Sequence, residues 1–239
     1  REVGWDARTL AGGYKAYRRW AVEQLASLPA RYTYRVVHGA TGSGKSRLLR
    51  ALQAAGAQVL DLEALAAHRG SVLGGLPAQP QPPQKLFETR VLATLRALDP
   101  AQPVYVEAES RKIGQVQVPE GLITAMRAAG CVMIEASVAT RVALLMDEYR
   151  HFFDDRPSLD AQLDCLVALH GRERIDTWKA MAREARWPML VERLLEEHYD
   201  PAYRRSAQRN FARLAEAPTH TLSSAADAAF AELAAQLNR

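Results

Sequence analysis

The sequence has little cysteine and no long apolar run, and each of these features argues against a class of protein. None of its apolar stretches approaches the ~20 residues of a membrane-spanning helix. The two cysteines, Cys131 and Cys165, show neither a CxxC motif nor Cys/His ligand spacing, which argues against a zinc site and a disulfide framework. Both fall in apolar or helical patterns and are expected to be buried. We therefore expect a cytoplasmic protein without a membrane partner.

The rest of the composition is that of an ordinary folded protein. Apolar residues make up 48% of the 239 residues and charged residues 24%, which is enough for one α/β domain with a helical appendage. The net charge of +4 is mild and suits an anionic partner. The chain starts at Arg1 without an initiator Met, and we expect it to be part of a longer protein.

Five short apolar runs, partly β-branched, alternate with helical patterns along the chain. The runs are 32–37, 58–62, 104–106, 131–134 and 219–222. The middle runs are nearly continuous rather than alternating, as in parallel strands that helices cover on both faces. The pattern predicts an α/β fold with a P-loop NTPase-like parallel sheet of about five strands.

Helical periodicity dominates a long segment before the last predicted strand. From 138 to 215 the pattern is helical almost throughout, which is too many helices for simple crossovers between strands. We expect a helical subdomain there, inserted into a core that comprises 21–137 and ends with the last strand and a closing helix in 216–239. The Pro- and Gln-rich segment 74–84 is predicted to be an exposed loop near the site.

A glycine-rich motif directly follows the first predicted strand. It reads GATGSGKS and matches the pattern GxxxxGK[ST]. Glycines let backbone N–H groups turn toward a phosphate, Lys45 adds a mobile positive charge, and Ser46 can ligate Mg²⁺. The motif also opens an amphipathic helix, whose N-terminus favours an anion. The predicted phosphate-binding residues of this P-loop are Gly39, Thr41, Gly42, Ser43, Gly44, Lys45 and Ser46.

The P-loop recognises phosphate oxygens rather than the group that carries them. A nucleotide is the usual ligand, but the sequence has no NKxD-type guanine-binding motif and no obvious adenine clamp. The residues themselves therefore leave open whether the ligand is a nucleotide or another diphosphate.

Carboxylates stand at the ends of the neighbouring predicted strands, where ligands collect in open α/β sheets. Asp61 ends the second strand and, with Ser46, is our candidate for holding a metal ion. Glu107 and Glu109 end the third strand, and alternation puts them on one side so that they can act together. The alternative interpretation is that these acids are simply solvated at the strand ends.

Arginines in two regions are candidates for binding anions. Arg69 with Ser71, and Arg111, lie just beyond the second and third strands, where guanidinium groups complete phosphate clamps. The segment 201–215 carries four arginines and no acid, a pattern that suits a track for RNA phosphates. A solvated surface is the alternative in both regions. The RNA-binding candidates are Arg204, Arg205 and Arg209. Arg205, Arg209 and Arg213 are spaced four apart, and we expect them to share one helix face.

The histidines do not suggest a nucleophilic relay. His38 directly precedes the P-loop, and His198 stands beside Tyr199. Neither has a Ser or Cys and an acid in the pattern that such a relay needs. We interpret both as structural, and no catalytic nucleophile is predicted.

Several sequence blocks, taken in order, resemble one family. Besides the P-loop, the blocks are Gly12 to Arg18, Val59 to Glu63, His68 to Ser71, Glu107 to Gly114, and His198 to Tyr203. They resemble the bacterial tRNA 2-selenouridine synthase family, and the likeness spans about 4–206. Several blocks in order are far more specific than a P-loop alone.

The resemblance implies an enzyme with an N-terminal rhodanese-like domain, which bears a catalytic Cys, and a C-terminal P-loop domain. Residues 1–20 resemble the last helix of the rhodanese-like part, which is thus an implied partner in the same chain. The implied substrate is wobble 2-thiouridine in the tRNA anticodon, which is S-geranylated from geranyl diphosphate before selenium from selenophosphate replaces the sulfur. The rhodanese loop and its Cys are absent here, so selenium transfer by this segment alone is not expected.

For the P-loop domain, the resemblance implies a part in geranyl transfer. The P-loop would hold the diphosphate leaving group through Lys45, backbone amides and Mg²⁺. The thiocarbonyl sulfur of the tRNA base would be the nucleophile, and the helical subdomain would supply an apolar pocket for the prenyl tail. The expected catalytic residues are Lys45, Glu107, Glu109 and Arg111.

Two other functions fit the same residues. An ATP-dependent kinase of a small molecule or nucleotide, or an ATPase, also combines a P-loop, a carboxylate-bearing strand and a helical lid with arginines. A non-catalytic tRNA-docking module with a relic P-loop is the second alternative. Phosphorylation by the domain would favour the first, and unimpaired chemistry without Lys45 would favour the second.

Overall fold

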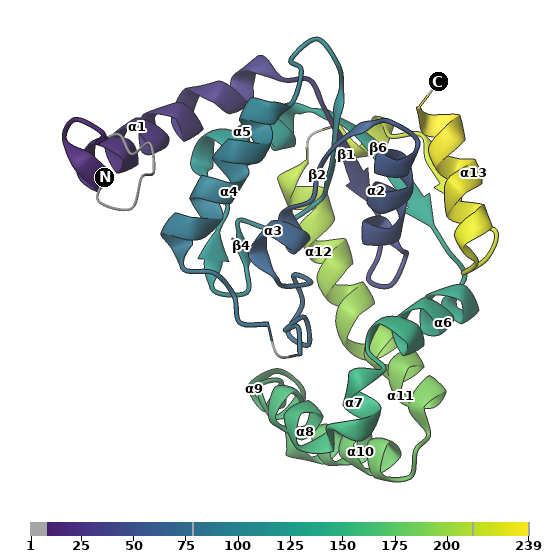
Figure 1. Cartoon of the computed structure of the whole chain (residues 1–239). Helices are drawn as coiled ribbons and strands as arrows, with labels where there is room; N and C mark the ends of the chain where they lie inside the picture. The colour runs from purple at the N-terminus through teal and green to yellow at the C-terminus, as the bar shows by residue number, and fades with distance from the viewer. Residues whose placement is uncertain (1–8, 78, 212, 239) are drawn as a thin grey trace, which may run out of the picture.

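The computed structural model describes residues 9–77, 79–211 and 213–238. At its centre lies a parallel sheet with the strand order β2-β3-β1-β6-β7 (Figure 1). In chain order, these strands are β1 (Tyr34–His38), β2 (Gln58–Leu60), β3 (Val104–Glu107), β6 (Gly130–Glu135) and β7 (Thr219–Thr221). In the register, Val36 of β1 lies opposite Val106 on one side and Cys131 on the other. The predicted α/β fold with five parallel strands is confirmed.

The order of the strands creates a crevice beside β1. From β1 the chain runs to β2 on one side of the sheet, whereas from β3 it crosses β1 and continues in β6 on the other side. Loops that leave neighbouring strands in opposite directions open a binding site at the carboxyl ends of those strands. The P-loop follows β1, and Glu107 ends β3.

Helices cover both faces of this sheet. On one face lie α1 (Gly13–Ser27), α4 (Gln84–Ala97) and α5 (Glu120–Ala128), and on the other α2 (Lys45–Ala54) and α13 (Asp227–Leu237) (Figure 1). Successive residues of β1 serve different layers, since Val36 packs in the first core cluster and Val37 in the second. Both are fully buried, which explains the nearly continuous apolar runs.

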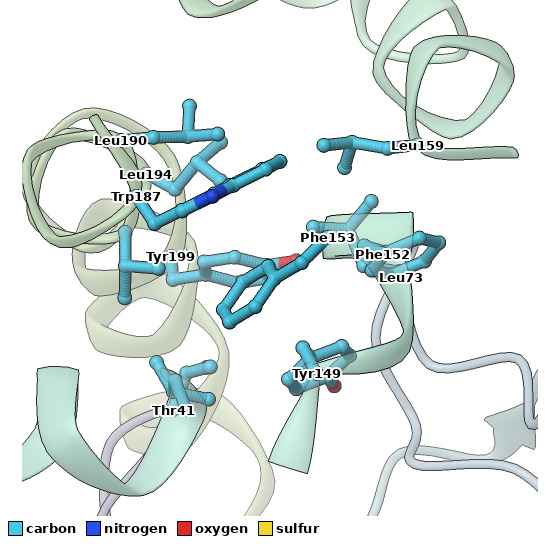
Figure 2. Close-up of a pocket in the computed structure, with 12 residues that line it drawn as sticks. Thr41, Leu73, Tyr149, Phe152, Phe153, Leu159, Trp187, Leu190, Leu194 and Tyr199 are labelled. Carbon is cyan, nitrogen blue, oxygen red and sulfur yellow. The ribbon is translucent and has the colours of Figure 1, made fainter. Parts of the chain in front are cut away.

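A helical layer lies beyond the carboxyl edge of the sheet (Figure 1). It has a core of its own around the buried Trp178 and Leu163, and aromatic side chains face one another inside it (Figure 2). Its elements are α6 (Val138–Glu148), α7 (His151–Asp154), α8 (Arg156–Asp164), α9 (Val167–His170), α10 (Arg172–Arg183), α11 (Trp187–Leu194), a π-helical segment (Leu195–Tyr199) and α12 (Asp200–Asn210).

Shorter elements complete the chain. They are a 3₁₀ turn (Leu28–Arg31), α3 (Leu62–Ala66), a hairpin of β4 (Lys112–Ile113) and β5 (Val116–Gln117), and a 3₁₀ turn (Leu214–Glu216). The hairpin strands are antiparallel to each other and form a separate small sheet. In the part of the chain that the structure describes, no helix is long and apolar enough to cross a membrane.

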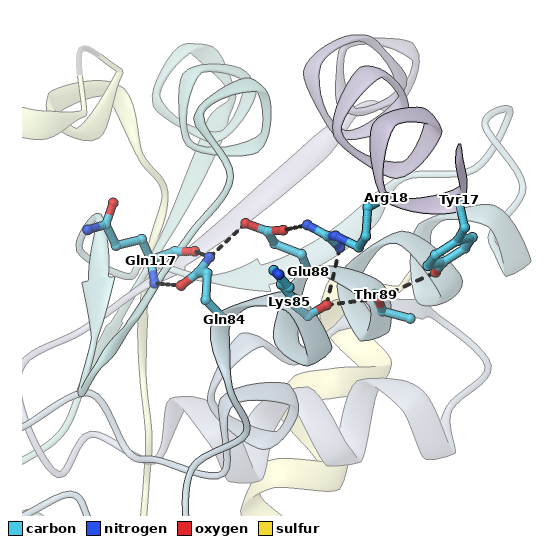
Figure 3. Close-up of polar contacts among 7 residues, drawn as sticks. All are labelled: Tyr17, Arg18, Gln84, Lys85, Glu88, Thr89 and Gln117. Atoms are coloured by element: carbon cyan, nitrogen blue, oxygen red, sulfur yellow. Dashed lines mark hydrogen bonds and ion pairs between the residues drawn. The ribbon is translucent and has the colours of Figure 1, made fainter. Parts of the chain in front are cut away.

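The first helix is attached to the core by polar contacts with α4 (Figure 3). The Tyr17 hydroxyl donates to Thr89 Oγ1 at 3.4 Å, and Arg18 pairs with Glu88. Ala21, further along α1, is fully buried in the main core. The helix therefore runs without a break across the domain boundary expected after residue 20. The origin of 1–20 in a rhodanese-like domain stays a prediction, and 1–8 lie outside the described residues.

Two expectations about individual residues were wrong. Cys165 is exposed, because it lies where α8 ends, whereas Cys131 is buried as expected. Helix α12 ends at Asn210, so Arg213 does not continue its face. The described part of 74–84 is a loop up to the start of α4, as expected, and Gln79, Pro80 and Pro83 are exposed. Pro82 within it is buried, and the neighbouring Gln81 donates to the carbonyl of Ile113 in the hairpin at 3.1 Å.

Candidate functional site

A cavity of about 340 Å³ opens at the carboxyl ends of β1 and β3. One part of its wall is the P-loop, and another consists of residues in α3 and in the loops after α3 and β3. The helical layer supplies the rest through α6, the π-helical segment and α12. Its polar lining residues include Thr41, Lys45, Ser46, Glu63, Arg69, Ser71, Glu109, Ser110, Glu148, Tyr149, His198, Tyr199 and Tyr203. Residues of the P-loop and of the helical layer thus face the same space.

The P-loop has the backbone geometry that phosphate binding requires. Gly42 and Gly44 adopt φ values of 78° and 82°, in the left-handed region that side chains disfavour. A Cβ atom on Gly39 would lie 2.3 Å from Ser43 Oγ, so only glycine fits there. Lys45 Nζ donates to the carbonyl oxygen of Gly39 at 2.9 Å, and α2 begins at Lys45 with its N-terminus toward the cavity. Of the predicted phosphate-binding P-loop residues, all but Gly39 and Ser43 line the cavity.

A chain of carboxylates stands beside the P-loop. The Ser46 hydroxyl donates to Glu63 Oε2 at 2.8 Å, and the backbone N–H of Glu63 donates to Glu107 Oε1 at 2.6 Å. Glu107 is only 1% exposed, so it is not the solvated residue of the alternative interpretation. Burial, and then the nearby charges of Asp61 and Glu63, raise the pKa of Glu107 well above its usual value. Burial, followed by repulsion from Glu63, raises the pKa of Glu109 to about 8.

The carboxylate that meets Ser46 is Glu63, not the predicted Asp61. Asp61 instead caps α3, where its Oδ1 accepts from the backbone N–H of Ala64 at 2.8 Å. Ser46 and Glu63 offer the oxygen ligands that Mg²⁺ prefers, and such a site takes its other ligands from water and phosphate. Among the described residues, no group of three or more His, Cys, Asp or Glu has the arrangement of a metal site. A magnesium site at Ser46 stays a prediction.

The predicted arginine clamp is only partly assembled. Arg69 lines the cavity, with its guanidinium carbon 4.9 Å from the ring centre of Tyr149. The Ser71 hydroxyl lies 3.4 Å from the Tyr149 hydroxyl. Arg111, in contrast, is exposed, pairs with Glu120 and does not line the cavity. The structure therefore brings Arg69 and Ser71 to the P-loop but leaves Arg111 outside.

A second, apolar pocket adjoins the first. It measures about 50 Å³ and shares Thr41, Leu145, Tyr149 and Tyr199 with the phosphate cavity. Figure 2 shows Thr41 of the P-loop at one end and Leu159 and Leu190 at the other. The remaining lining residues are Leu73, Phe152, Phe153, Trp187, Val191 and Leu194. The sequence predicted an apolar pocket in the helical layer, but of the residues that line it only Thr41 was a predicted site residue, and that for phosphate.

Arg141 connects the P-loop to the helical layer. Its Nε donates to the carbonyl oxygen of Thr41 at 2.8 Å, and its two terminal nitrogens donate to the carboxylate of Asp200 at 3.0 and 2.5 Å. The Arg141 side chain is 7% exposed. Bidentate pairs of this kind are geometrically specific, so the pair holds α6 and the start of α12 in register with the P-loop.

The arginines predicted to bind RNA lie on α12. Arg204 and Arg205 are exposed, and Arg204 Nε donates to the carbonyl oxygen of Asp200 at 3.4 Å. The side chain of Arg209 lies outside the described residues. The track for RNA phosphates on this helix stays a prediction.

Fold and site together define a P-loop α/β protein in which an apolar pocket adjoins the cavity at the P-loop. A profile of the tRNA 2-selenouridine synthase AAA domain matches residues 32–162, and the chain belongs to this family. It is 36% identical over 152 residues to tRNA 2-selenouridine synthase of Nitrosomonas europaea, covering 62% of this chain and 39% of the relative. The enzyme of Alcanivorax borkumensis is 31% identical over 234 residues, 85% of this chain and 62% of the relative.

A third relative gives the same picture. The tRNA 2-selenouridine synthase of Shewanella halifaxensis is 38% identical over 153 residues, which cover 63% of this chain and 40% of the relative. The chain thus spans 39 to 62% of the length of these relatives. The family expected from the sequence blocks is confirmed.

Proposed function

We propose that this chain binds geranyl diphosphate and transfers the geranyl group to the sulfur of wobble 2-thiouridine in tRNA. This step would precede the exchange of sulfur for selenium in a cytoplasmic tRNA 2-selenouridine synthase. The selenium step would use selenophosphate and the rhodanese-like domain of the longer protein. The proposal rests on the family of the chain and on the two joined cavities.

The observation that carries the proposal is that the P-loop cavity and the apolar pocket adjoin each other. Four residues line both spaces, so a diphosphate held by Lys45 directs its organic group toward Tyr149, Tyr199 and Trp187. A hydrocarbon chain without hydrogen-bonding groups suits such aromatic walls. A ribose and an adenine, by contrast, carry polar groups that these walls do not satisfy.

The chemistry needs no nucleophile from the protein. The thiocarbonyl sulfur attacks C1 of the geranyl group while the C1–O bond breaks, so negative charge develops on the diphosphate. Lys45, the N–H groups of the P-loop and Arg69 stabilise that charge. Mg²⁺, when bound at Ser46, supplies further charge neutralisation. The buried Glu107 holds the backbone of Glu63, and Glu63 in turn accepts from Ser46.

The anionic substrates also fit the charge of the chain. A net charge of +4 favours the approach of tRNA. The exposed Arg204 and Arg205, with Arg209, would bind phosphates of the anticodon arm. Their helix starts next to the cavity, since Ala202 and Tyr203 line it.

Isothermal titration calorimetry tests the proposal directly. Geranyl diphosphate, inorganic diphosphate and ATP are titrated, each with Mg²⁺, into the chain and into a Leu190→Trp variant. Leu190 is 2% exposed and lines the apolar pocket, so the larger side chain fills it. We expect geranyl diphosphate to bind the unsubstituted chain at least ten times more tightly than inorganic diphosphate, and we expect Leu190→Trp to abolish that difference.

Met189→Trp is the matched control, because Met189 lies on the same helix but is 43% exposed. This control should bind geranyl diphosphate like the unsubstituted chain. Tight binding of ATP without binding of geranyl diphosphate would instead support the kinase or ATPase alternative.

A further inference from the structure

S-geranylation of 2-thiouridine releases a proton as well as diphosphate. The neutral base carries a hydrogen on N3, and attack by its sulfur on C1 of the geranyl group leaves a cation. The neutral product forms only when the N3–H bond gives up its proton. A base at the junction of the phosphate cavity and the apolar pocket would accept that proton, and general bases of this kind accelerate reactions 10²–10⁴-fold.

His198 stands at that junction. It is 8% exposed and lines the phosphate cavity, while its neighbour Tyr199 lines both spaces. Both residues belong to the π-helical segment Leu195–Tyr199 between α11 and α12. Single π-helical turns are rare and often occur at functional sites, because they shift the direction of side chains within a helix.

A second histidine continues from His198 toward solvent. His198 Nδ1 lies 3.0 Å from His170 Nε2, a hydrogen bond that leaves the Nε2 atom of His198 available to a substrate. His170 lines a different hollow, on the outer surface of the helical layer, together with Arg174 and Glu197. The Trp178 ring supports the His170 ring edge-on, with 5.1 Å between the centres.

The surroundings favour the neutral form of both rings. Burial, and then the nearby His170 and Arg205, lower the pKa of His198. Burial lowers the pKa of His170 as well, with a further lowering by Arg174 and an opposing effect of Glu197. A neutral imidazole has a free lone pair that accepts a proton near pH 7.

Glu109 also borders the cavity but belongs to its phosphate end. After burial, the charged groups that act on its pKa are Glu63, which accepts from Ser46, and Lys45 of the P-loop, so Glu109 lies where the diphosphate leaves. A proton acceptor for the tRNA base is needed at the other end of the breaking bond, beside the apolar pocket.

We propose that His198 is the general base that accepts the N3 proton of 2-thiouridine, and that His170 passes this proton to solvent. The proposal rests on the proposed geranyl transfer and names its proton acceptor. In the step, the S–C1 bond forms and the C1–O bond breaks, and diphosphate leaves with the electron pair. The N3 proton moves to Nε2 of His198, Nδ1 of His198 gives its proton to Nε2 of His170, and His170 releases one to water. His198 is then a catalytic residue and His170 a positioning residue that also relays the proton.

The test measures single-turnover geranylation of an anticodon stem-loop RNA that contains 2-thiouridine, from pH 6 to 10. The variants are His198→Gln and His170→Gln, with His220→Gln on β7 as the control. Near pH 7 we expect the rate to fall about 100-fold in His198→Gln and about tenfold in His170→Gln. Alkaline pH should restore His198→Gln toward the unsubstituted rate, because N3 of the thiouracil ring then ionises without a base. A loss of packing would not be restored in this way.

Calorimetry with geranyl diphosphate separates this proposal from the function on which it rests. The proposed role of the two histidines is supported if His198→Gln binds geranyl diphosphate with unchanged affinity, loses rate near pH 7 and recovers that rate at alkaline pH. A normal rate in His198→Gln, or a rate loss that high pH does not restore, would contradict the proposed role of the two histidines. The proposed geranyl transfer would not be affected by that result. If the unsubstituted chain neither binds geranyl diphosphate nor modifies the RNA, the proposed function itself fails.

Discussion

The P-loop cavity and the adjoining apolar pocket, which we call the phosphate end and the apolar end after their proposed ligands, are built in opposite ways. The phosphate end uses backbone atoms and side chains of one short motif, from Gly39 to Ser46, with a left-handed Gly42 and Gly44. The apolar end takes side chains from segments far apart in the sequence, from Leu73 through Tyr149 to Trp187 and Leu194. The first end can be recognised in a linear sequence, whereas the second exists only after the helices have packed.

The ends also differ in their energetics. The phosphate end carries buried ionisable groups, since burial raises the pKa values of Glu107 and Glu109, and such groups cost stability when they ionise. The apolar end has no such cost in stability, because burial of aromatic surface is favourable in itself. Binding by the first end should therefore depend on pH and charge, and binding by the second on shape and volume.

Glu109→Gln should remove much of the pH dependence of stability at the phosphate end. The pKa of Glu109 is raised to about 8 in the folded chain, so its stability contribution is full below the unfolded value near 4.5 and is lost as the pH rises toward 8. Because Glu109 borders the cavity, solvent screens part of this effect. We therefore expect the variant to be more stable than the unsubstituted chain by about 3 kcal/mol at pH 8 and equally stable at pH 4.

Urea denaturation at the two pH values measures this difference. Glu120→Gln, which replaces an exposed glutamate, is the control and should leave the pH profile unchanged. An equal effect of Glu109→Gln at both pH values would show that its carboxyl titrates normally.

Lys45→Ala should weaken every diphosphate-bearing ligand to a similar extent. Its ammonium group is the mobile charge of the P-loop and now donates to Gly39 at 2.9 Å, and we expect affinity for geranyl diphosphate and for inorganic diphosphate to fall on the order of 100-fold. Calorimetry measures both ligands, with the exposed Lys112→Ala as control. A loss limited to the prenylated ligand would contradict the division of the cavity into two ends.

Arg141→Ala should uncouple the two ends. The substitution removes the hydrogen bond to Thr41 and leaves Asp200 unpaired, and we expect a loss of about 2 kcal/mol in the free energy of unfolding. Urea denaturation measures the loss. Arg141→Lys keeps the charge without the bidentate geometry. Its free energy of unfolding should lie between those of the unsubstituted chain and Arg141→Ala. Full stability of Arg141→Ala would mean that the helical layer does not depend on this pair.

Trp187→Leu should have the smallest effect and act on the apolar end alone. The Trp187 ring stacks on Phe153 with 4.6 Å between the ring centres, and leucine keeps an apolar side chain while losing the aromatic wall. We expect geranyl diphosphate to bind about fivefold more weakly and inorganic diphosphate to bind unchanged. Calorimetry of both ligands, with Met189→Leu as the control on the same helix, checks this. Weaker binding of inorganic diphosphate would show that the two ends are not independent.

Much of the fold was predictable because its signals are local. The five strands lie within or next to the predicted apolar runs, since each run is short, and the central strands β1, β3 and β6 are largely buried on both faces. The phosphate-binding motif needed only its spacing and the strand before it. Strand order, by contrast, depends on which way each crossover turns, and no single run contains that information.

For the acids beside the P-loop, the sequence did not predict which carboxylate contacts Ser46. Asp61 and Glu63 are two residues apart, and the sequence does not say which of them faces Ser46. The answer came from α3, because a helix that begins after Asp61 uses that carboxylate as its cap and turns Glu63 toward the cavity. The signal that could have found it is the capping pattern at Asp61.

By itself, the sequence determined the phosphate end, the parallel sheet and the family, because glycine spacing, apolar runs and ordered blocks are properties of neighbouring residues. Only the tertiary structure decided that Tyr149, Trp187 and Tyr199 enclose one apolar pocket and that His170 meets His198. The physical reason is that contacts between residues far apart in the chain arise from the packing of whole helices.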